Sequence, residues 1–150
     1  YLRQRYPEVF ASDRFRVFTF VREPLALQMS LYRFLQKKGQ PTLEKAEAHI
    51  FTRPNYLARM LSVDDANFEE SMEKYYFIGI LERAQESMDR LASEIGKKPI
   101  ELPWVNRTRG DGESDSHGIS PEVVERFRSV NTLDYRIYEY CLERFDKLRA

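Results

Sequence analysis

Hydrophobic residues along the chain alternate between short continuous runs and longer stretches with helical spacing. Residues 15–21 and 75–81 are short and rich in aromatic and β-branched side chains, which is typical of buried strands. Apolar positions three and four apart predict a helix after each run, from Pro24 to Gly39 and from about residue 84 to Gly96. Strands that alternate with helices predict an α/β domain with a parallel sheet.

The other segments predict shorter helices and loops. We expect a short helix within residues 1–12, a helix capped by Thr42 that runs to about residue 50, and another over residues 55–61. Residues 63–67 and the glycine-rich segment 107–118 are predicted loops, and we expect the second to be exposed and mobile. Residues 100–105 are predicted to be extended. Ser120 is placed to cap a helix. A last helix is expected to turn inward the residues Leu133, Ile137, Cys141, Phe145 and Leu148.

The helix that begins at Pro24 is apolar around most of its circumference. Its apolar residues are Leu25, Leu27, Met29, Leu31, Tyr32, Phe34 and Leu35. A helix of this kind is expected to be buried on several sides. Ser30 stands out because it places a hydroxyl in the middle of this apolar stretch.

Composition narrows the class of protein. The 150 residues suit one domain with a real core, and 42% hydrophobic and 13% aromatic residues are typical of globular proteins. Lys plus Arg equals Asp plus Glu, 24 against 24, which argues against a general nucleic-acid or membrane-surface binder. No apolar run reaches the roughly 20 residues of a membrane span. The single cysteine, Cys141, leaves no internal disulfide or cysteine cluster, and we expect a buried thiol.

Candidate chemistry lies where the first predicted strand meets the next helix. Arg22 ends the strand, Pro24 opens the helix, and Ser30 follows eight residues after the arginine. The unpaired N–H groups and positive end of a helix N-terminus favour anions, and a guanidinium fork suits phosphate. Two plainer interpretations remain open: Arg22 pairs with Glu23 or another acid, and the Ser30 hydroxyl bonds the carbonyl of Ala26.

The pattern Arg-x-Pro-x5-Ser after a Phe-x-Phe-Val strand resembles the 3′-phosphate-binding motif of sulfotransferases that use 3′-phosphoadenosine 5′-phosphosulfate (PAPS). The likeness is strongest to the carbohydrate (Golgi-type) branch and its bacterial relatives. It continues through FIGILE at 77–82, LPWVNRT at 102–108 and NTLDYRIY at 131–138, so it covers most of residues 15–145. In that family the matching arginine and serine hold the 3′-phosphate, which implies this role for Arg22 and Ser30.

The resemblance also implies a fold and a reaction. It implies a P-loop-type three-layer α/β domain, with a short parallel sheet flanked by helices, that transfers a sulfuryl group from PAPS to an acceptor hydroxyl, on a saccharide. A loop that covers the nucleotide in the family implies Asn106, Arg107 and Thr108 as further nucleotide-binding residues. The expected partners are a nucleotide donor and a hydroxyl acceptor, with no metal, no nucleic acid and no membrane segment in this chain.

One element of the family is missing. Family members begin with a strand and a lysine-containing loop that grips the 5′-phosphosulfate, and nothing before residue 15 matches it; residues 37–42 have a faint likeness but follow the arginine motif. We therefore expect residues 1–150 to be one domain, the C-terminal portion of a larger one, and inactive alone. The implied compartment is the cytoplasm for a bacterial protein, or the Golgi lumen if an N-terminal anchor precedes the chain.

The sequence assigns no catalytic residue. Sulfuryl transfer needs a general base, but neither His49 nor His117 matches the family position, and two isolated histidines lack the spacing of metal ligands. Asn55 and Arg59 are candidates for the acceptor cleft. Two other classes remain: a non-catalytic α/β interaction module that has lost the donor site, and a P-loop kinase relative, which the missing Walker motif disfavours.

Overall fold

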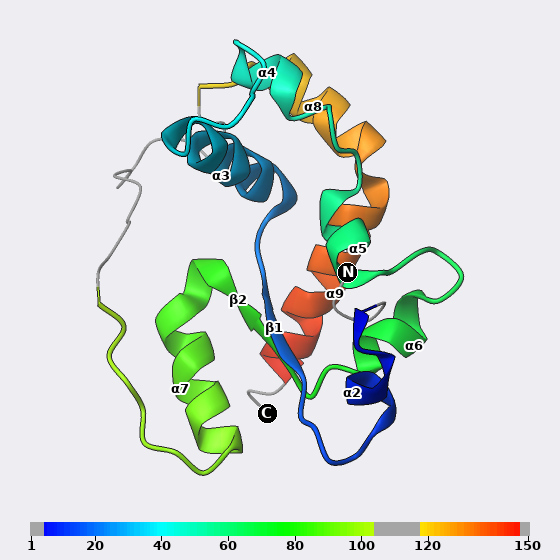
Figure 1. The fold of residues 1–150 in the computed structure, drawn as a ribbon, viewed down its shortest axis with the longest axis vertical. Coiled ribbons are helices and arrows are strands. Elements are labelled where there is room, and N and C mark those ends of the chain that lie inside the picture. The colour runs from blue at the N-terminus through cyan, green and yellow to red at the C-terminus, as the bar shows by residue number, and fades with distance from the viewer. Residues whose placement is uncertain (1–4, 104–117, 148–150) are drawn as a thin grey trace.

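The computed structural model describes residues 5–103 and 118–147. In chain order the elements are α2 (Pro7–Ala11), β1 (Phe18–Val21), α3 (Pro24–Lys37), α4 (Ala46–His49), α5 (Tyr56–Leu61), α6 (Phe68–Glu73), β2 (Phe77–Ile80), the 3-10 turn η1 (Leu81–Arg83), α7 (Ala84–Glu94), α8 (Pro121–Val130) and α9 (Thr132–Lys147). β1 and β2 pair in parallel, with Val21 beside Ile80. The fold is thus mixed α/β with a small two-stranded parallel sheet flanked by helices (Figure 1), which confirms the coarse prediction.

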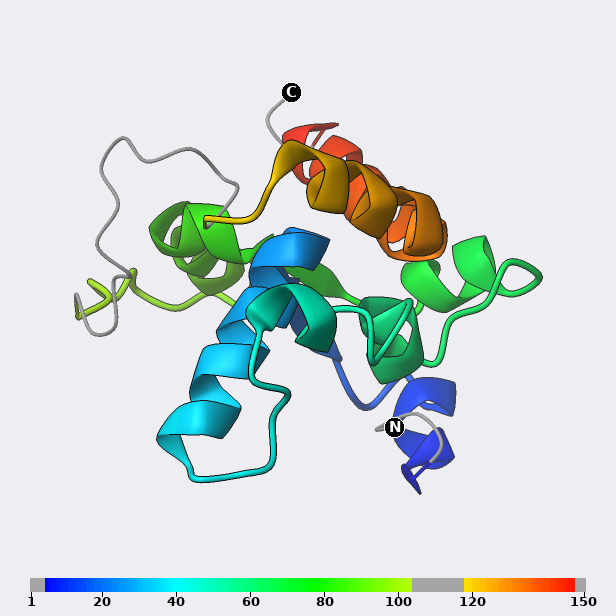
Figure 2. The same cartoon turned by 90° about the horizontal axis from the view of Figure 1, so that it is seen from above.

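The two strands differ in how far helices cover them. β2 is buried along its whole length, with α7 and α9 packed on it, and Figure 2 shows α9 along one side of the strands. β1 runs from Phe18, which is 54% exposed, to Val21, which is 1% exposed. The buried end of β1 is the end that leads into α3.

Gly79 leaves room on β2 for an aromatic ring from β1. A Cβ at this position would lie 2.5 Å from Cε1 of Phe20, its register partner on β1. The Phe20 ring also packs against Phe77 with the ring centroids 6.3 Å apart. The aromatic ring therefore occupies the space that a glycine leaves over β2.

Two hydrophobic clusters form the core. The first joins the strands to α5, α6, α7 and α9 and contains Phe77, Ile137 and Phe145. Cys141 lies in this cluster, and burial raises the pKa of its thiol to about 12. The second cluster joins α3, α4 and α8, and its members are Leu25, Met29, Ile50, Ile119 and Phe127. No helix among the described residues is long and apolar enough to cross a membrane.

Helix ends mostly follow their predicted signals. Pro24 begins α3, Gly39 just beyond that helix has a φ of +63°, and the Ser120 side chain accepts a hydrogen bond from the Val123 N–H at the start of α8. The prediction for Thr42 is wrong, because α4 begins only at Ala46 and has no side-chain cap. The one apolar residue of segment 42–45, Leu43, is 47% exposed, so this segment buries no apolar face that would hold a longer helix against α3.

One other expectation fails, one helix was not expected, and one predicted loop falls outside the description. α3 buries one face only, because it packs on α4, α5 and α9, and Phe34 is 55% exposed. α6 was not predicted, because it is only six residues long and offers a single pair of large apolar residues at helical spacing, Phe68 and Met72, within an acidic stretch. Residues 97–103 form neither helix nor strand, while 104–117, which include nearly all of the predicted mobile loop, lie outside the described residues.

Candidate functional site

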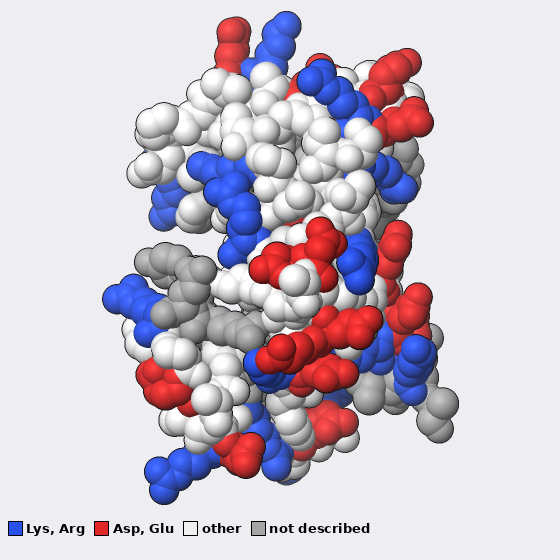
Figure 3. All heavy atoms as spheres, turned by 90° about the vertical axis from the view of Figure 1, so that its right-hand side faces the viewer, with Lys and Arg blue, Asp and Glu red and all other residues white. Residues whose placement is uncertain are grey.

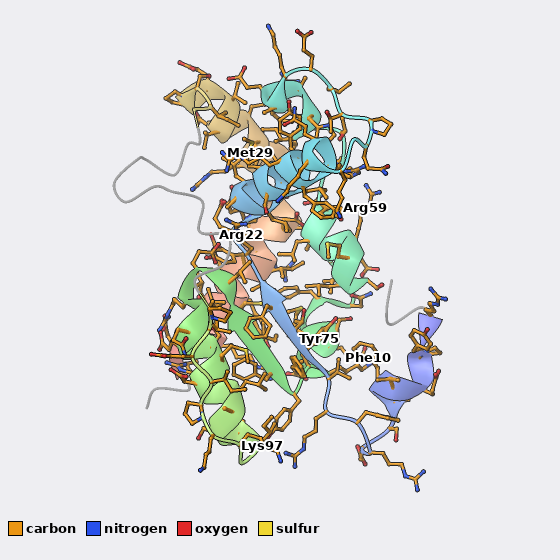
Figure 4. All side chains as sticks on the ribbon, turned by 60° about the vertical axis from the view of Figure 1, so that its left-hand side comes forward. Phe10, Arg22, Met29, Arg59, Tyr75 and Lys97 are labelled. Atoms are coloured by element: carbon orange, nitrogen blue, oxygen red, sulfur yellow. The ribbon has the colours of Figure 1, made fainter. Side chains whose placement is uncertain are left out.

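The candidate site lies at the C-terminal end of the sheet. The parallel register places Val21 beside Ile80, so the residues that follow both strands emerge at the same edge. Figure 4 shows Arg22 at the arrowhead end of β1, close to the start of α3. In open α/β sheets ligands bind at this edge, outside the carboxyl ends of the strands.

Arg22 faces a carboxylate from the neighbouring strand end. Its Nε lies 3.8 Å from Oε1 of Glu82 in η1, and the two side chains are 26% and 37% exposed. This separation exceeds hydrogen-bond length, so the pair is held by charge alone. The simpler interpretation of the sequence, in which Arg22 pairs with Glu23 or another acid, therefore holds with Glu82 as that acid.

The two glutamates are fixed by donors from three elements. Glu82 accepts hydrogen bonds from the Glu23 N–H (3.0 Å) and the Tyr138 hydroxyl (3.2 Å). Glu23 accepts from the Ala26 N–H (2.7 Å) and the Tyr135 hydroxyl (2.7 Å). Tyr135 and Tyr138 are three residues apart and therefore share one face of α9. The site is consequently a network that ties the start of α3 and the end of β2 to α9.

The sequence analysis did not identify the tyrosines of this network. Burial and then the hydrogen bond to Glu23 raise the pKa of Tyr135 well above its ordinary value, so its hydroxyl stays protonated and donates. The guanidinium of Arg128 lies 5.0 Å from the centre of the Tyr135 ring. The only available signal was the Tyr-x-x-Tyr spacing within the segment 131–138, which tyrosines of an ordinary amphipathic helix also show.

The start of α3 offers fewer free donors than a bare helix end. Pro24 has no N–H, the Ala26 N–H is bound by the Glu23 side chain, and the Leu27 N–H bonds the Glu23 carbonyl at 2.8 Å. Glu23 also brings a negative charge to the positive end of the helix. An anion at this edge would therefore depend on side chains more than on the helix end.

Ser30 is half-buried on α3, and its hydroxyl has no hydrogen-bond partner among the described residues. The simpler interpretation, a bond to the Ala26 carbonyl, is therefore not what the structure shows. Six residues separate Ser30 from Pro24, which corresponds to about 9 Å along the helix axis. No contact joins Arg22 and Ser30 among the described residues, so their joint role stays a prediction.

The other predicted nucleotide-binding residues, Asn106, Arg107 and Thr108, lie outside the described residues. Asn55, a candidate for the acceptor cleft, is instead bound to the start of α9. Its N–H donates to Oδ1 of Asn131 at 2.8 Å, and its own Oδ1 accepts from the Asp134 N–H at 3.3 Å. These contacts give Asn55 a place in the joint between α5 and α9.

Arg59 lines a hollow whose lining residues do not include Arg22, Glu82 or Ser30. The hollow has a volume of about 870 Å³ and lies between α2, α5 and α6, with Phe10, Asp64 and Lys74 among its lining residues. The Phe10 ring packs edge-on against Tyr75 at 5.6 Å, and Figure 4 shows both near the start of β1. Figure 3 shows acidic side chains across the middle of the face that carries α5 and α6. Because its lining residues come from α2, α5 and the segments next to α5 and α6, the hollow is separate from the strand-end site.

His49 lies away from the strand ends, at the end of α4. It is buried, its Nδ1 accepts the Leu43 N–H at 3.3 Å, and its ring packs 5.1 Å from that of Tyr32. Burial and then the charge of Arg53 lower the pKa of His49. Within residues 5–103 and 118–147, no three His, Cys, Asp or Glu side chains gather in a way that suits a metal ion.

Comparisons of the chain with models of protein families, with curated proteins and with solved structures found no match. A functional assignment therefore depends on the residues at the strand ends.

Proposed function

We propose that this chain binds the 3′-phosphate of PAPS and belongs to a sulfotransferase that acts on an acceptor hydroxyl, with a saccharide as the acceptor class. The observation that supports the proposal most is the position of Arg22 at the C-terminal end of a parallel strand, directly before a helix that begins with proline. A P-loop-type identity of the small α/β domain is part of the same proposal.

The residues at the site fit a phosphate in two respects. The Arg22 fork is partly exposed and meets Glu82 only through a long contact at Nε, which leaves donors for a ligand. The Ser30 hydroxyl has no partner among the described residues and is free to donate. In one respect the fit is poorer, since Glu23 already binds the N–H of Ala26.

The expected chemistry is an in-line transfer. The bond between sulfur and the bridging phosphate oxygen breaks, a bond between sulfur and the acceptor oxygen forms, and the acceptor loses its proton, which leaves adenosine 3′,5′-bisphosphate. Arg22 and Ser30 would hold the 3′-phosphate and so position the nucleotide, and positioning is a main source of rate in reactions of this kind. No residue of this chain is assigned as the base.

A non-catalytic α/β interaction module is the second candidate. It is favoured by the ion pair between Arg22 and Glu82, because an arginine with an internal partner has a sufficient structural role. On this alternative Arg22 joins the two strand ends and meets no ligand.

Calorimetric titration of the chain with adenosine 3′,5′-bisphosphate separates the two candidates. For the sulfotransferase, Arg22→Ala should weaken binding by about 1.5–3 kcal/mol and Ser30→Ala by about 0.5–1.5 kcal/mol, since a charged contact exceeds a neutral hydroxyl bond. Arg14→Ala is the matched control, because Arg14 is exposed in the turn before β1. Equal, negligible losses for Arg22→Ala and Ser30→Ala, or no binding at all, would favour the interaction module.

A further inference from the structure

Glu82 holds a fixed position beside the arginine of the proposed site. It lies in η1, directly after β2, and its two oxygens accept hydrogen bonds from the Glu23 N–H at 3.0 Å and the Tyr138 hydroxyl at 3.2 Å. These donors come from the turn before α3 and from α9, so the carboxylate is anchored independently of Arg22. An anchored carboxylate cannot readily move away when a ligand arrives.

Arg22 is the loosely held partner of this pair. Its closest contact with Glu82 is 3.8 Å, and about a quarter of its side chain is exposed. A charge-assisted hydrogen bond to an anion would be shorter, near 2.8 Å, and therefore stronger than the present contact. The arginine can thus exchange its internal partner for an external one.

The surroundings of Arg22 carry more negative than positive charge. Glu23, the next residue, has its carboxylate bound to Tyr135, and Glu82 lies 3.8 Å from Nε of Arg22, while Arg128 stacks on the ring of Tyr135. Arg83, which follows Glu82, is itself engaged by Glu86 and Asp146. A bound anion would remain close to at least one ionised carboxylate, which would oppose its binding.

We propose that Glu82 is an internal counter-ion of Arg22 that competes with the bound phosphate and lowers the affinity of the site for its nucleotide. This inference rests on the proposed function. In the free protein Glu82 stabilises Arg22 at the strand end. In the complex the phosphate takes the arginine, and the fixed charge of Glu82 then favours release of the ligand.

Titration of adenosine 3′,5′-bisphosphate into wild type and Glu82→Gln tests the proposal. Glutamine retains the shape and an acceptor for the Glu23 N–H, so the network stays in place while the charge is removed. We expect the variant to bind about 3- to 10-fold more tightly, the effect of one partly exposed like charge. Glu139→Gln removes the same charge from an exposed position on α9 and should leave the affinity unchanged.

A third variant separates charge from loosened packing. Tyr138→Phe removes the hydroxyl that anchors Glu82 but leaves the carboxylate group in the chain, so it should not tighten binding. Tighter binding in this variant equal to that in Glu82→Gln would overturn the proposal, as would wild-type affinity or weaker binding in Glu82→Gln. In these cases the proposed function would stand, because wild type would still bind. Absence of binding in both wild type and Glu82→Gln would overturn the proposed function together with the inference.

Discussion

The Asp134 carboxylate in the first turn of α9 accepts a hydrogen bond of 2.8 Å from the backbone N–H of Ala58 in α5. Its second oxygen accepts from the Leu57 N–H at 2.9 Å, and Asp134 is only 1% exposed. One buried side chain therefore satisfies the free donors at the start of a short helix. The joint between α5 and α9 depends on it.

Replacement of Asp134 should weaken this joint. Asp134→Ala leaves two buried N–H groups without acceptors and should lower the free energy of unfolding by about 2–4 kcal/mol. Asp134→Asn keeps one acceptor and should cost less. Urea denaturation of the three proteins measures both effects, with Asp65→Ala, an exposed acid before α6, as the control. Equal stability of Asp134→Ala and wild type would show that the two N–H groups find other partners.

A side chain at Gly79 should push the Phe20 ring from its place over β2. Gly79→Ala would put a Cβ 2.5 Å from that ring, and overpacking of this kind costs about 1–3 kcal/mol of stability. The smaller side chain of Phe20→Leu should relieve the contact, so Gly79→Ala should cost less in that background. A double-mutant cycle by thermal or urea unfolding measures the coupling. Additive losses would mean that Phe20 is not the obstacle.

Acid should destabilise the contact between α3 and α4 through His49. Because the folded-state pKa of His49 lies below the ordinary value of 6.5, the unfolded chain takes up the proton first. The contribution of the uncharged, buried His49 to stability is therefore fully present above about pH 6.5, and it is lost as the pH falls toward the lowered pKa of the folded state. The free energy of unfolding of wild type should fall over this range more steeply than that of His49→Gln.

His117→Gln is the matched control for this experiment, because it removes the other histidine of the chain. It should retain the pH dependence of wild type. If the stability of His117→Gln did not change with pH while His49→Gln kept the wild-type slope, the titrating group would be His117 and the prediction for His49 would be wrong.

The sequence by itself predicted both strands, most of the helices and the place of Arg22 at the end of the first strand. Short β-rich runs, a proline at the start of α3 and a glycine just past its end are local signals, so they predicted β1, β2 and α3. They also placed Arg22 at the end of a parallel strand. Each of these features depends on neighbouring residues in the chain or on the hydrophobic period.

Only the tertiary structure decided which side chains meet. Glu82 faces Arg22 across 60 positions of sequence, and the tyrosines of α9 reach the two glutamates from more than 50 positions away. The exposed side of α3 and the late start of α4, at Ala46 instead of after Thr42, likewise depend on which elements pack against them. Such partners are chosen by the parallel register and by helix packing, and neither leaves a signal in the local spacing of residues.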